Sequence, residues 1–317
     1  MRRGLLSFVG RRLLLAVLLV FVVSSASLLL VDAAPGDHFS AFDLDPATAA
    51  AERHRLGLDK SLPARYGAWL ARATRFDFGE SMKYRRPVVQ LVAERAPMTA
   101  LLGAVALAIA TLIGVPAGIF TGSRRNALTA AARALSLVVV SVPSLVTSFG
   151  LLFLAARTGW LPVGGLASTA DGHAWTAARY LILPATALAL PIAATIERLQ
   201  SQALSDALSE PSVRAALARG CSRRRAVWRH AFRLSLTPVL AIYGVIVGTV
   251  LSGSFAVEIV TSWPGLGALM YDALVSRDLF LVAGCAAAGA VFLAFGTLIA
   301  DVALALADPR TSESVPS

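Results

Sequence analysis

The residues that could support covalent or metal chemistry are few and scattered along this chain. No two of its four histidines have the spacing of a helical metal-binding pair. Cys221 lies in a basic segment and Cys285 in an apolar run, so we expect neither a disulfide nor a thiolate metal site. Ser252 and Ser254 have no histidine in their apolar run that could act as a base. We therefore predict no catalytic residue and no metal ligand.

The sequence also lacks its own means of driving a reaction or a transport step. An ATP-binding loop needs a lysine after glycine, and neither Lys60 nor Lys83 follows one. An ion-coupled secondary transporter needs ionisable residues at mid-membrane depth, but Glu197 and Asp301 fall near the ends of apolar runs. A secondary transporter stays an alternative, although the sequence lacks the buried charge that such a transporter requires. We expect another protein to provide the energy.

A basic segment with internal order, Ser212 to Pro238, separates two apolar runs. Ser209 is placed to cap a helix, with Glu210 and Pro211 in its first turn. Gly220 is placed to end that helix after about ten residues. Val213 and Leu217, four residues apart, predict one small apolar face. A helix this short and this poor in bulky residues suits a protein partner better than a lipid surface.

A second helix is predicted from Ser222, as its cap, to Leu236. We place its apolar residues on one side: Val227, Trp228, Ala231, Phe232 and Ser235. Arginines occupy much of the remaining surface. Two interpretations stay open, a basic helix on anionic head groups and a helix packed beneath a membrane bundle.

Over the whole chain, 56% of the 317 residues are hydrophobic and 15% are charged. A soluble domain carries about 25% charged residues, and apolar runs of about 20 residues can cross a bilayer. Six such runs are predicted as transmembrane helices: 13–31, 98–120, 135–156, 180–195, 236–257 and 281–306. The first is too long for a signal peptide. The fold class is an all-α polytopic membrane protein.

Arginine-rich and arginine-poor loops alternate between these runs. The segment between the fourth and fifth runs carries eight arginines and three acidic residues. This bias predicts that both termini and loop 198–235 are cytoplasmic and that loop 32–97 is external. It also accounts for the net charge of +10 without nucleic-acid binding.

Two further patterns concern packing. Within the first loop, residues 47–58 and 63–75 are predicted as helices of a small folded cap, the alternative being a loosely packed loop. Gly114 with Gly118, and Gly244 with Gly248, stand four residues apart, which favours close approach of membrane helices.

A series of short segments, in order along nearly the whole chain, resembles one family. Ala215-Ala216-x-x-x-Gly220 is similar to the EAA loop of ABC importer permeases, with Arg214 where many members have glutamate. Cys221, Leu217 and the pair Leu234-Ser235 depart from the usual pattern of the dipeptide/oligopeptide branch. The other matching segments are Ala34-Pro35-Gly36-Asp37, Leu56-Gly57-Leu58-Asp59, Phe78-Gly79-Glu80-Ser81 with Arg86-Pro87-Val88, Gly159-Trp160-Leu161-Pro162, Leu183-Pro184-Ala185, Glu258 with Trp263-Pro264-Gly265-Leu266-Gly267, Arg277-Asp278 and Asp308-Pro309-Arg310.

The resemblance implies a type I ABC importer permease, of the first-subunit type, with six transmembrane helices and a cytoplasmic coupling helix. It implies a second homologous permease in a heterodimer, two cytoplasmic ATPases and an external solute-binding protein, all at the inner or plasma membrane. ATP and magnesium would bind to the ATPases and no cofactor to this chain. Peptides are the expected cargo, with nickel complexes or glutathione as alternatives.

The same resemblance assigns roles to two groups of residues. The residues implied in coupling to the ATPase are Val213, Arg214, Ala215, Ala216, Leu217, Arg219 and Gly220. The residues of a possible external gate are Glu258, Trp263, Pro264, Gly265 and Gly267, for which a plain turn is the alternative. The expected organisation is an N-terminal helix with its external loop over 1–97, a five-helix core over 98–310 and a tail over 311–317.

Overall fold

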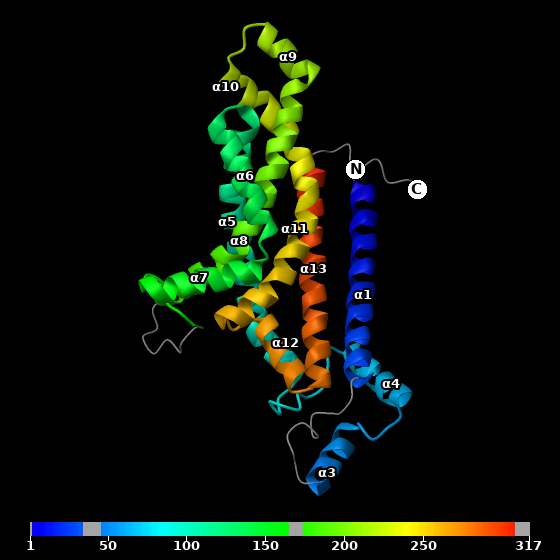
Figure 1. The fold of residues 1–317 in the computed structure, drawn as a ribbon. Coiled ribbons are helices and arrows are strands. Elements are labelled where there is room, and N and C mark those ends of the chain that lie inside the picture. Colours follow the sequence, from blue (N-terminus) through cyan, green and yellow to red (C-terminus); the bar gives the residue numbers. More distant parts are fainter. Residues whose placement is uncertain (1, 34–45, 165–173, 308–317) are drawn as a thin grey trace. The chain divides into compact units, whose positions relative to one another are not determined.

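The computed structural model describes residues 2–33, 46–164 and 174–307, and its regular elements are helices (Figure 1). The elements are α1 (Arg2–Ala33), α3 (Pro46–Leu56), α4 (Leu62–Ala73), α5 (Val88–Ser123), α6 (Ala127–Ser141), α7 (Ser144–Thr158), α8 (Ala174–Ser209), α9 (Pro211–Ala218), α10 (Arg223–Arg225), the π-helix η1 (Ala226–Ala231), α11 (Phe232–Thr261), α12 (Leu266–Val275) and α13 (Leu279–Ala307). The prediction of an all-α polytopic membrane protein is confirmed.

Within the described residues, five helical stretches are long and apolar enough to cross a membrane. They are Gly10–Val31, Val88–Ser123, Ala178–Ser209, Arg223–Thr261 and Leu279–Leu304. A sixth span is complete only if the bent pair α6 and α7 counts as one. The five or six helices agree with the predicted fold.

The third predicted span, 135–156, is not one straight helix. Helices α6 and α7 meet at an angle of 101°, with Val142 and Pro143 between them. Val142 adopts an extended conformation (φ −92°, ψ 117°), which a residue before proline favours, and Pro143 has no amide hydrogen for the helix ladder. Figure 1 shows α7 turning sharply away from α6.

The fourth predicted span, 180–195, is too short. Helix α8 continues through Pro184 and Pro191 as far as Ser209. Prolines are tolerated inside membrane helices because surrounding groups can satisfy the freed carbonyls. Glu197 consequently lies inside the helix rather than at its end.

The chain forms two compact units, each of which combines distant segments. The first takes the described residues of 1–12, 100–263 and 293–317, and the second takes 13–99 and 264–292. One boundary, at 99/100, lies close to the predicted division at 97. The second unit also includes residues 264–292, which we had predicted to belong to the five-helix core over 98–310.

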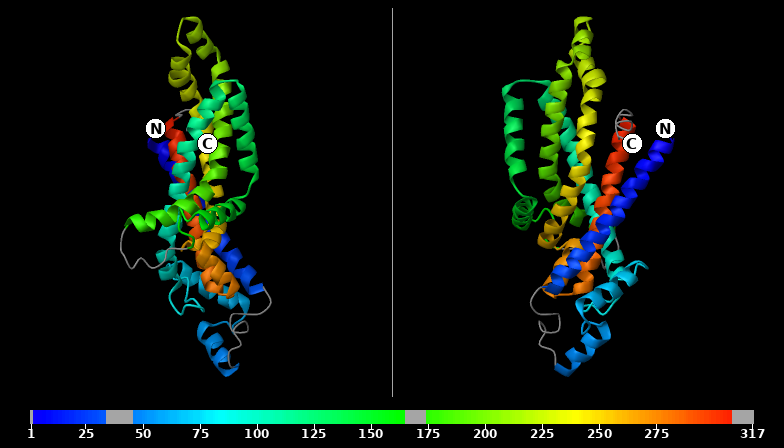
Figure 2. Two further views of the ribbon diagram at one scale, coloured as in Figure 1. Left: turned by 60° about the vertical axis from the view of Figure 1, so that its left-hand side comes forward. Right: turned by 90° about the vertical axis from the view of Figure 1, so that its right-hand side faces the viewer.

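In the first unit α8 lies between α6 and α11, as Figures 1 and 2 show. Its contact with α5 depends on three glycines of α5, because a Cβ atom added at any of them would collide with a backbone carbonyl oxygen of α8. The distance from the added Cβ would be 2.6 Å to the oxygen of Ala193 for Gly114, 2.7 Å to that of Glu197 for Gly118 and 2.6 Å to that of Ser201 for Gly122. The close approach predicted for Gly114 and Gly118 is thus confirmed. Gly244 and Gly248 make only ordinary contacts with α13.

The second unit has its own apolar core. Leu28, Trp69, Val88 and Phe280 are buried there, so α1, α4, α5 and α13 each contribute to it. The Tyr66 hydroxyl donates to Ser25 Oγ at 2.8 Å and ties α4 to α1. Helices α3 and α4 lie within two residues of the predicted ones, and this part of the loop is folded.

Candidate functional site

Helix α9 follows α8 directly and has well-defined ends. Glu210 is its N-cap residue and Pro211 its first residue, and no side chain caps it. The predicted cap by Ser209 is wrong, because Ser209 ends α8 and its hydroxyl donates to the Asp206 carbonyl at 2.7 Å. Glu210 accordingly precedes the first turn instead of lying in it.

The predicted stop at Gly220 is confirmed. Gly220 has φ +87°, the left-handed conformation that glycine adopts without steric cost. Its amide donates to the Leu217 carbonyl at 3.0 Å, and the next amide, of Cys221, donates to the Ala216 carbonyl at 3.1 Å. These two bonds form a Schellman motif, which satisfies the last carbonyls of the helix and reverses the chain.

The faces of α9 differ from the predicted ones. Val213 is fully buried and Ala216 nearly so, whereas Leu217 is 37% exposed, so Val213 and Leu217 do not share one apolar face. The buried pair is three residues apart, a spacing that also places two side chains on one side of a helix. The exposed residues of the predicted coupling set are Arg214, Ala215, Leu217, Arg219 and Gly220, and we call these the exposed face of α9.

A small apolar cluster holds the other side of α9 to the rest of the first unit. Val213 packs there with Ile119 of α5 and Leu204 of α8. The π-helix η1 contributes Ala226, Val227 and Ala231, and α8 also contributes Ala207. Because buried side chains interdigitate with little free volume, we expect a shift of α9 to displace α8 and η1 with it.

Residues 222–231, which follow α9 and which we call the return segment, continue directly into the helix of the fifth span and do not form a separate helix. Ser222 caps α10 as predicted, its hydroxyl accepting from the Arg225 amide at 3.4 Å. The chain then passes through η1 into α11, and Pro238 lies inside that helix. Trp228 is 55% exposed and does not lie on the buried side with Val227 and Ala231 as predicted.

Arg223 links this return segment to α5. Its guanidinium donates to the carbonyl of Ser123, the last residue of α5, at 2.9 Å. The last carbonyls of a helix have no partner within it, so a cation there satisfies one of them and interacts favourably with the helix dipole. This bond adds a polar contact with α5 to the apolar contact between Val213 and Ile119.

Two of the candidate gate residues lie at the end of α11. Glu258 and Trp263 are almost completely buried, and the Trp263 amide donates to the Glu258 carbonyl at 2.9 Å. The left-handed residue that ends the helix is Ser262, at φ 53°. A serine therefore provides the turn conformation that we expected from the nearby glycines.

The other gate candidates belong to the second unit. Gly265 is extended (φ −104°, ψ −170°), a conformation open to any residue, and it precedes α12. The Leu266 amide donates to Thr99 Oγ1 at 2.8 Å. Pro264 is the residue before Gly265. Gly267 is buried within α12, so it does not form the turn that we predicted for it.

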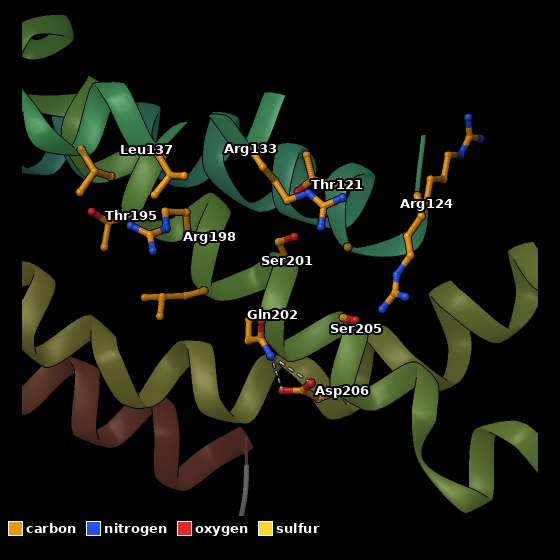
Figure 3. A pocket seen from close by; sticks show the side chains of 14 residues that line it. Thr121, Arg124, Arg133, Leu137, Thr195, Arg198, Ser201, Gln202, Ser205 and Asp206 are labelled. Atoms are coloured by element: carbon orange, nitrogen blue, oxygen red, sulfur yellow. Dashed lines mark hydrogen bonds between the residues drawn. The ribbon is translucent and has the colours of Figure 1, made fainter. Parts of the chain in front are cut away.

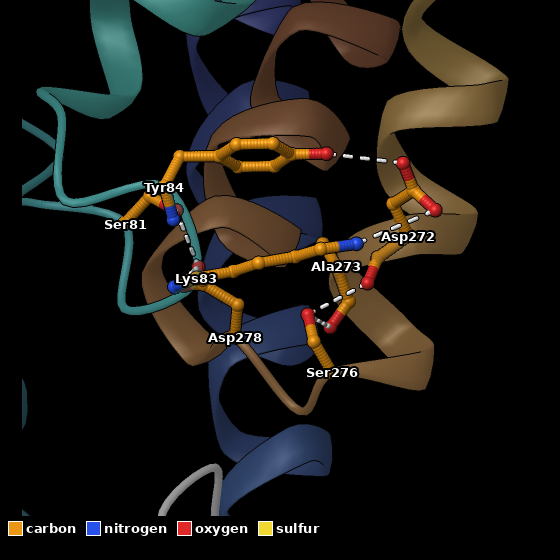
Figure 4. Close-up of polar contacts among 7 residues, drawn as sticks. All are labelled: Ser81, Lys83, Tyr84, Asp272, Ala273, Ser276 and Asp278. Carbon is orange, nitrogen blue, oxygen red and sulfur yellow. Dashed lines mark hydrogen bonds and ion pairs between the residues drawn. The ribbon is translucent and has the colours of Figure 1, made fainter. Parts of the chain in front are cut away.

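The second unit contains a polar clamp that we did not predict from the sequence (Figure 4). Asp278 is fully buried, and its Oδ2 accepts from the Ser81 hydroxyl at 2.6 Å and the Lys83 amide at 3.1 Å. Its Oδ1 accepts from the Leu281 amide at 3.2 Å, in the first turn of α13. Asp278 thus fastens the segment before α5 to the start of α13.

Asp272 forms the second part of this clamp. Its carboxylate accepts from the Tyr84 hydroxyl at 3.0 Å and lies 3.5 Å from Lys83 Nζ. Burial and the bond to Asp272 raise the pKa of Tyr84 above its ordinary value. Ser81 and Arg277-Asp278 lie in segments that we had matched to a family pattern, but nothing in their sequence positions linked them.

Comparisons with known proteins agree along the whole chain. The family model described as "Binding-protein-dependent transport system inner membrane component" matches residues 114–313, and the model of the N-terminal part of such membrane components matches residues 5–103. The oligopeptide transport system permease protein AppB of Bacillus subtilis is 30% identical over 96% of this chain and 98% of its own. The di/tripeptide transport system permease protein DppB of Pseudomonas aeruginosa is 32% identical over the same shares.

Proposed function

The chain belongs to the inner membrane components of binding-protein-dependent transport systems, and on that premise we propose that it conducts peptides in an ATP-driven importer. It is a multi-pass permease subunit, a transport component that works with ATPase and solute-binding components. Peptide cargo is supported by the two relatives, whose names both specify peptides. Neither of these two names mentions nickel or glutathione.

The observation that carries the mechanism is the division of α9 into a buried and an exposed side. We propose that the exposed face of α9 docks into a groove of a cytoplasmic ATPase. An eight-residue helix is about 12 Å long, which suits insertion into a shallow groove. Leu217 would meet an apolar floor, while Arg214 and Arg219 would meet acidic residues at the rim. Val213 and Ala216 would act from behind, by keeping α9 attached to α8 and η1.

Motion of the ATPase would then reach the membrane through two long helices. A single residue, Glu210, separates α8 from α9, and α11 follows η1 without a break. Both pack on the cluster that holds α9, so a push on the exposed face displaces them together. This movement would alternate access to the peptide path between the two sides of the membrane. The residues 258–267 would shape the external end of that path.

The remaining assignments follow the arginine distribution and the family. We place the chain in the inner membrane with both termini and α9 on the cytoplasmic side, since the arginine-rich loops alternate with poor ones. A second homologous permease would complete the path, and two ATPases would each receive one coupling helix. ATP and magnesium would bind to those ATPases and not to this chain.

Reconstitution tests this function. The chain, its companion permease, the ATPases and the binding protein are incorporated into vesicles, and uptake of a labelled di- or tripeptide is measured. We expect uptake only with ATP inside the compartment that the ATPases face. Uptake that continues with a hydrolysis-deficient ATPase would overturn the proposal, and ATP-dependent uptake of glutathione or a nickel complex without peptide uptake would overturn the cargo assignment.

A further inference from the structure

Two adjoining hollows open beside α8 in the first unit. Their volumes are about 760 and 750 Å³, and they share Gly122, Arg124, Arg125 and Ser205 in their walls. The larger one runs along α6 and α8, and the smaller one extends to Arg214 and Arg223. Together they form one site, which we call the arginine hollow; of its lining residues, Arg214 also belongs to the exposed face of α9.

The arginine hollow carries a large excess of positive charge. Six arginines line it: Arg124, Arg125, Arg133, Arg198, Arg214 and Arg223. The carboxylate among its lining residues is Asp206, and both oxygens of that group accept from Gln202 Nε2, at 3.1 and 3.2 Å. In the described parts of the chain, no carboxylate lies within 4.0 Å of these guanidinium groups.

Several of these arginines are held in place by neutral partners. Arg133 Nε donates to the Thr129 carbonyl at 3.2 Å, Arg223 donates to the Ser123 carbonyl, and Arg124 lies over the Phe120 ring. Such contacts orient a guanidinium without neutralising it. Repulsion among unneutralised cations is costly, and an anion bound between them would relieve it.

The walls of the larger hollow are not uniformly basic. Leu137, Val140 and Leu199 line it together with the arginines. In Figure 3, Leu137 lies with Thr195 and Arg198 at one end, and Arg124 and Ser205 lie toward the other. The outer face of α6 beside Leu137 is also apolar, with Leu135 63% and Val138 62% exposed. The occupant that matches these features has an anionic head and an apolar tail.

We propose that the arginine hollow binds one anionic phospholipid. Its phosphate would be held by Arg124, Arg125 and the Ser205 hydroxyl, which both hollows share, and an acyl chain would extend along α6 toward Leu137. Basic pockets between membrane helices are suited to such head groups because the arginine fork matches phosphate oxygens. A zwitterionic lipid offers no net negative charge, and a free phosphate ion makes no use of the apolar end.

The test uses the full-length purified chain in detergent, with retained lipids counted by native mass spectrometry. The probes are phosphatidylglycerol, phosphatidylcholine and inorganic phosphate. In the test variant, Arg124→Gln and Arg125→Gln remove two exposed arginines of the hollow. In the matched control, Arg157→Gln and Arg224→Gln remove two exposed arginines outside it. A third variant, Arg124→Lys with Arg125→Lys, keeps the charge.

We expect phosphatidylglycerol to bind about tenfold more tightly than phosphatidylcholine, and the Gln pair to weaken that binding about tenfold. The control and the Lys pair should stay within about twofold of the unchanged chain. Equal retention of the two lipids, or equal losses in the test and control variants, would overturn the proposal. Displacement of phosphatidylglycerol by inorganic phosphate at equal concentration would assign the site to free phosphate instead, and would also overturn it.

Discussion

At the scale of single residues, Gly118 determines how closely α5 and α8 can pack. A Cβ there would lie 2.6 Å from Gln200 Cβ and 2.7 Å from the Glu197 carbonyl oxygen, and backbone cannot yield as a flexible side chain can. We expect Gly118→Ala to destabilise the chain by about 1–3 kcal/mol, the usual cost of overpacking. The midpoint of thermal unfolding in detergent measures this loss.

Gly150 provides the matched control for that substitution. It also lies inside a helix, α7, but a Cβ added there has nothing within 4 Å. Gly150→Ala should be neutral or stabilise by up to about 1 kcal/mol, since alanine favours helix more than glycine does. Equal midpoints for the two variants would contradict the packing described for α5 and α8.

Tyr84 is the residue for which the structure gives a pH dependence. Its neutral hydroxyl donates to Asp272, and burial together with this bond raises its pKa above the ordinary 10.0. Folding therefore gains stability from Tyr84 below pH 10, and this gain is lost as the pH rises through the raised pKa.

The titration can be followed by the ultraviolet absorbance of tyrosinate. The difference between the unchanged chain and Tyr84→Phe should show a midpoint above 10.0 in the folded protein. In Asp272→Asn this midpoint should fall, because a negative neighbour is lost. A midpoint below 10.0 in the unchanged chain would show that Tyr84 does not donate to Asp272.

At the scale of elements, Asp278 links the segment before α5 to the start of α13. Its carboxylate accepts from two amides and one hydroxyl while fully buried. Asp278→Ala leaves these donors without a partner, and we expect a loss of about 2–3 kcal/mol or more. Chemical unfolding in detergent would measure it.

Asp59→Ala is the control for the Asp278→Ala substitution. The Asp59 side chain is 45% exposed and only approaches His54, at 3.9 Å, so its loss should change stability by less than about 0.5 kcal/mol. If Asp278→Ala unfolds at the same denaturant concentration as Asp59→Ala, the clamp does not hold these elements together.

The elements differ in how far the sequence could predict them. Long apolar runs and the signal at Gly220 are local, so four of the spans and the C-terminal end of α9 were accessible. The start of α9 was less so, because the residue predicted as its cap, Ser209, ends α8. The face of α9 was not, because Val213, Ala215, Ala216 and Leu217 are all small or apolar. Only the packing of Leu204 and Ala226 against it selects Val213 for burial.

Longer-range features depend on partners that no local pattern contains. Ser81 and Asp278 are 197 positions apart, so their hydrogen bond could not be predicted from spacing. Glycines four residues apart predicted that α5 approaches some helix closely, yet not that this helix is α8. The uninterrupted course of α8 past Pro184 and Pro191 was likewise not predictable, because the groups that satisfy the freed carbonyls lie elsewhere in the chain.

At the scale of the whole molecule, we propose α9 as the connection between ATP hydrolysis and transport. Its exposed face is available to a partner, and its buried side joins α8 and α11. A variant of the exposed face should therefore spare folding and membrane insertion. Leu217→Asp is suitable, because Leu217 is 37% exposed and an aspartate there would be tolerated until it entered an apolar groove.

The most direct test is peptide uptake per ATP hydrolysed by the complete reconstituted importer. We expect Leu217→Asp to lower this ratio about tenfold or more, as truncation of an interface hot spot does. Arg224→Ala, at an exposed residue of the same loop outside α9, should leave the ratio within about twofold. An unchanged ratio in Leu217→Asp, with normal insertion, would contradict the assignment of α9 as the coupling element.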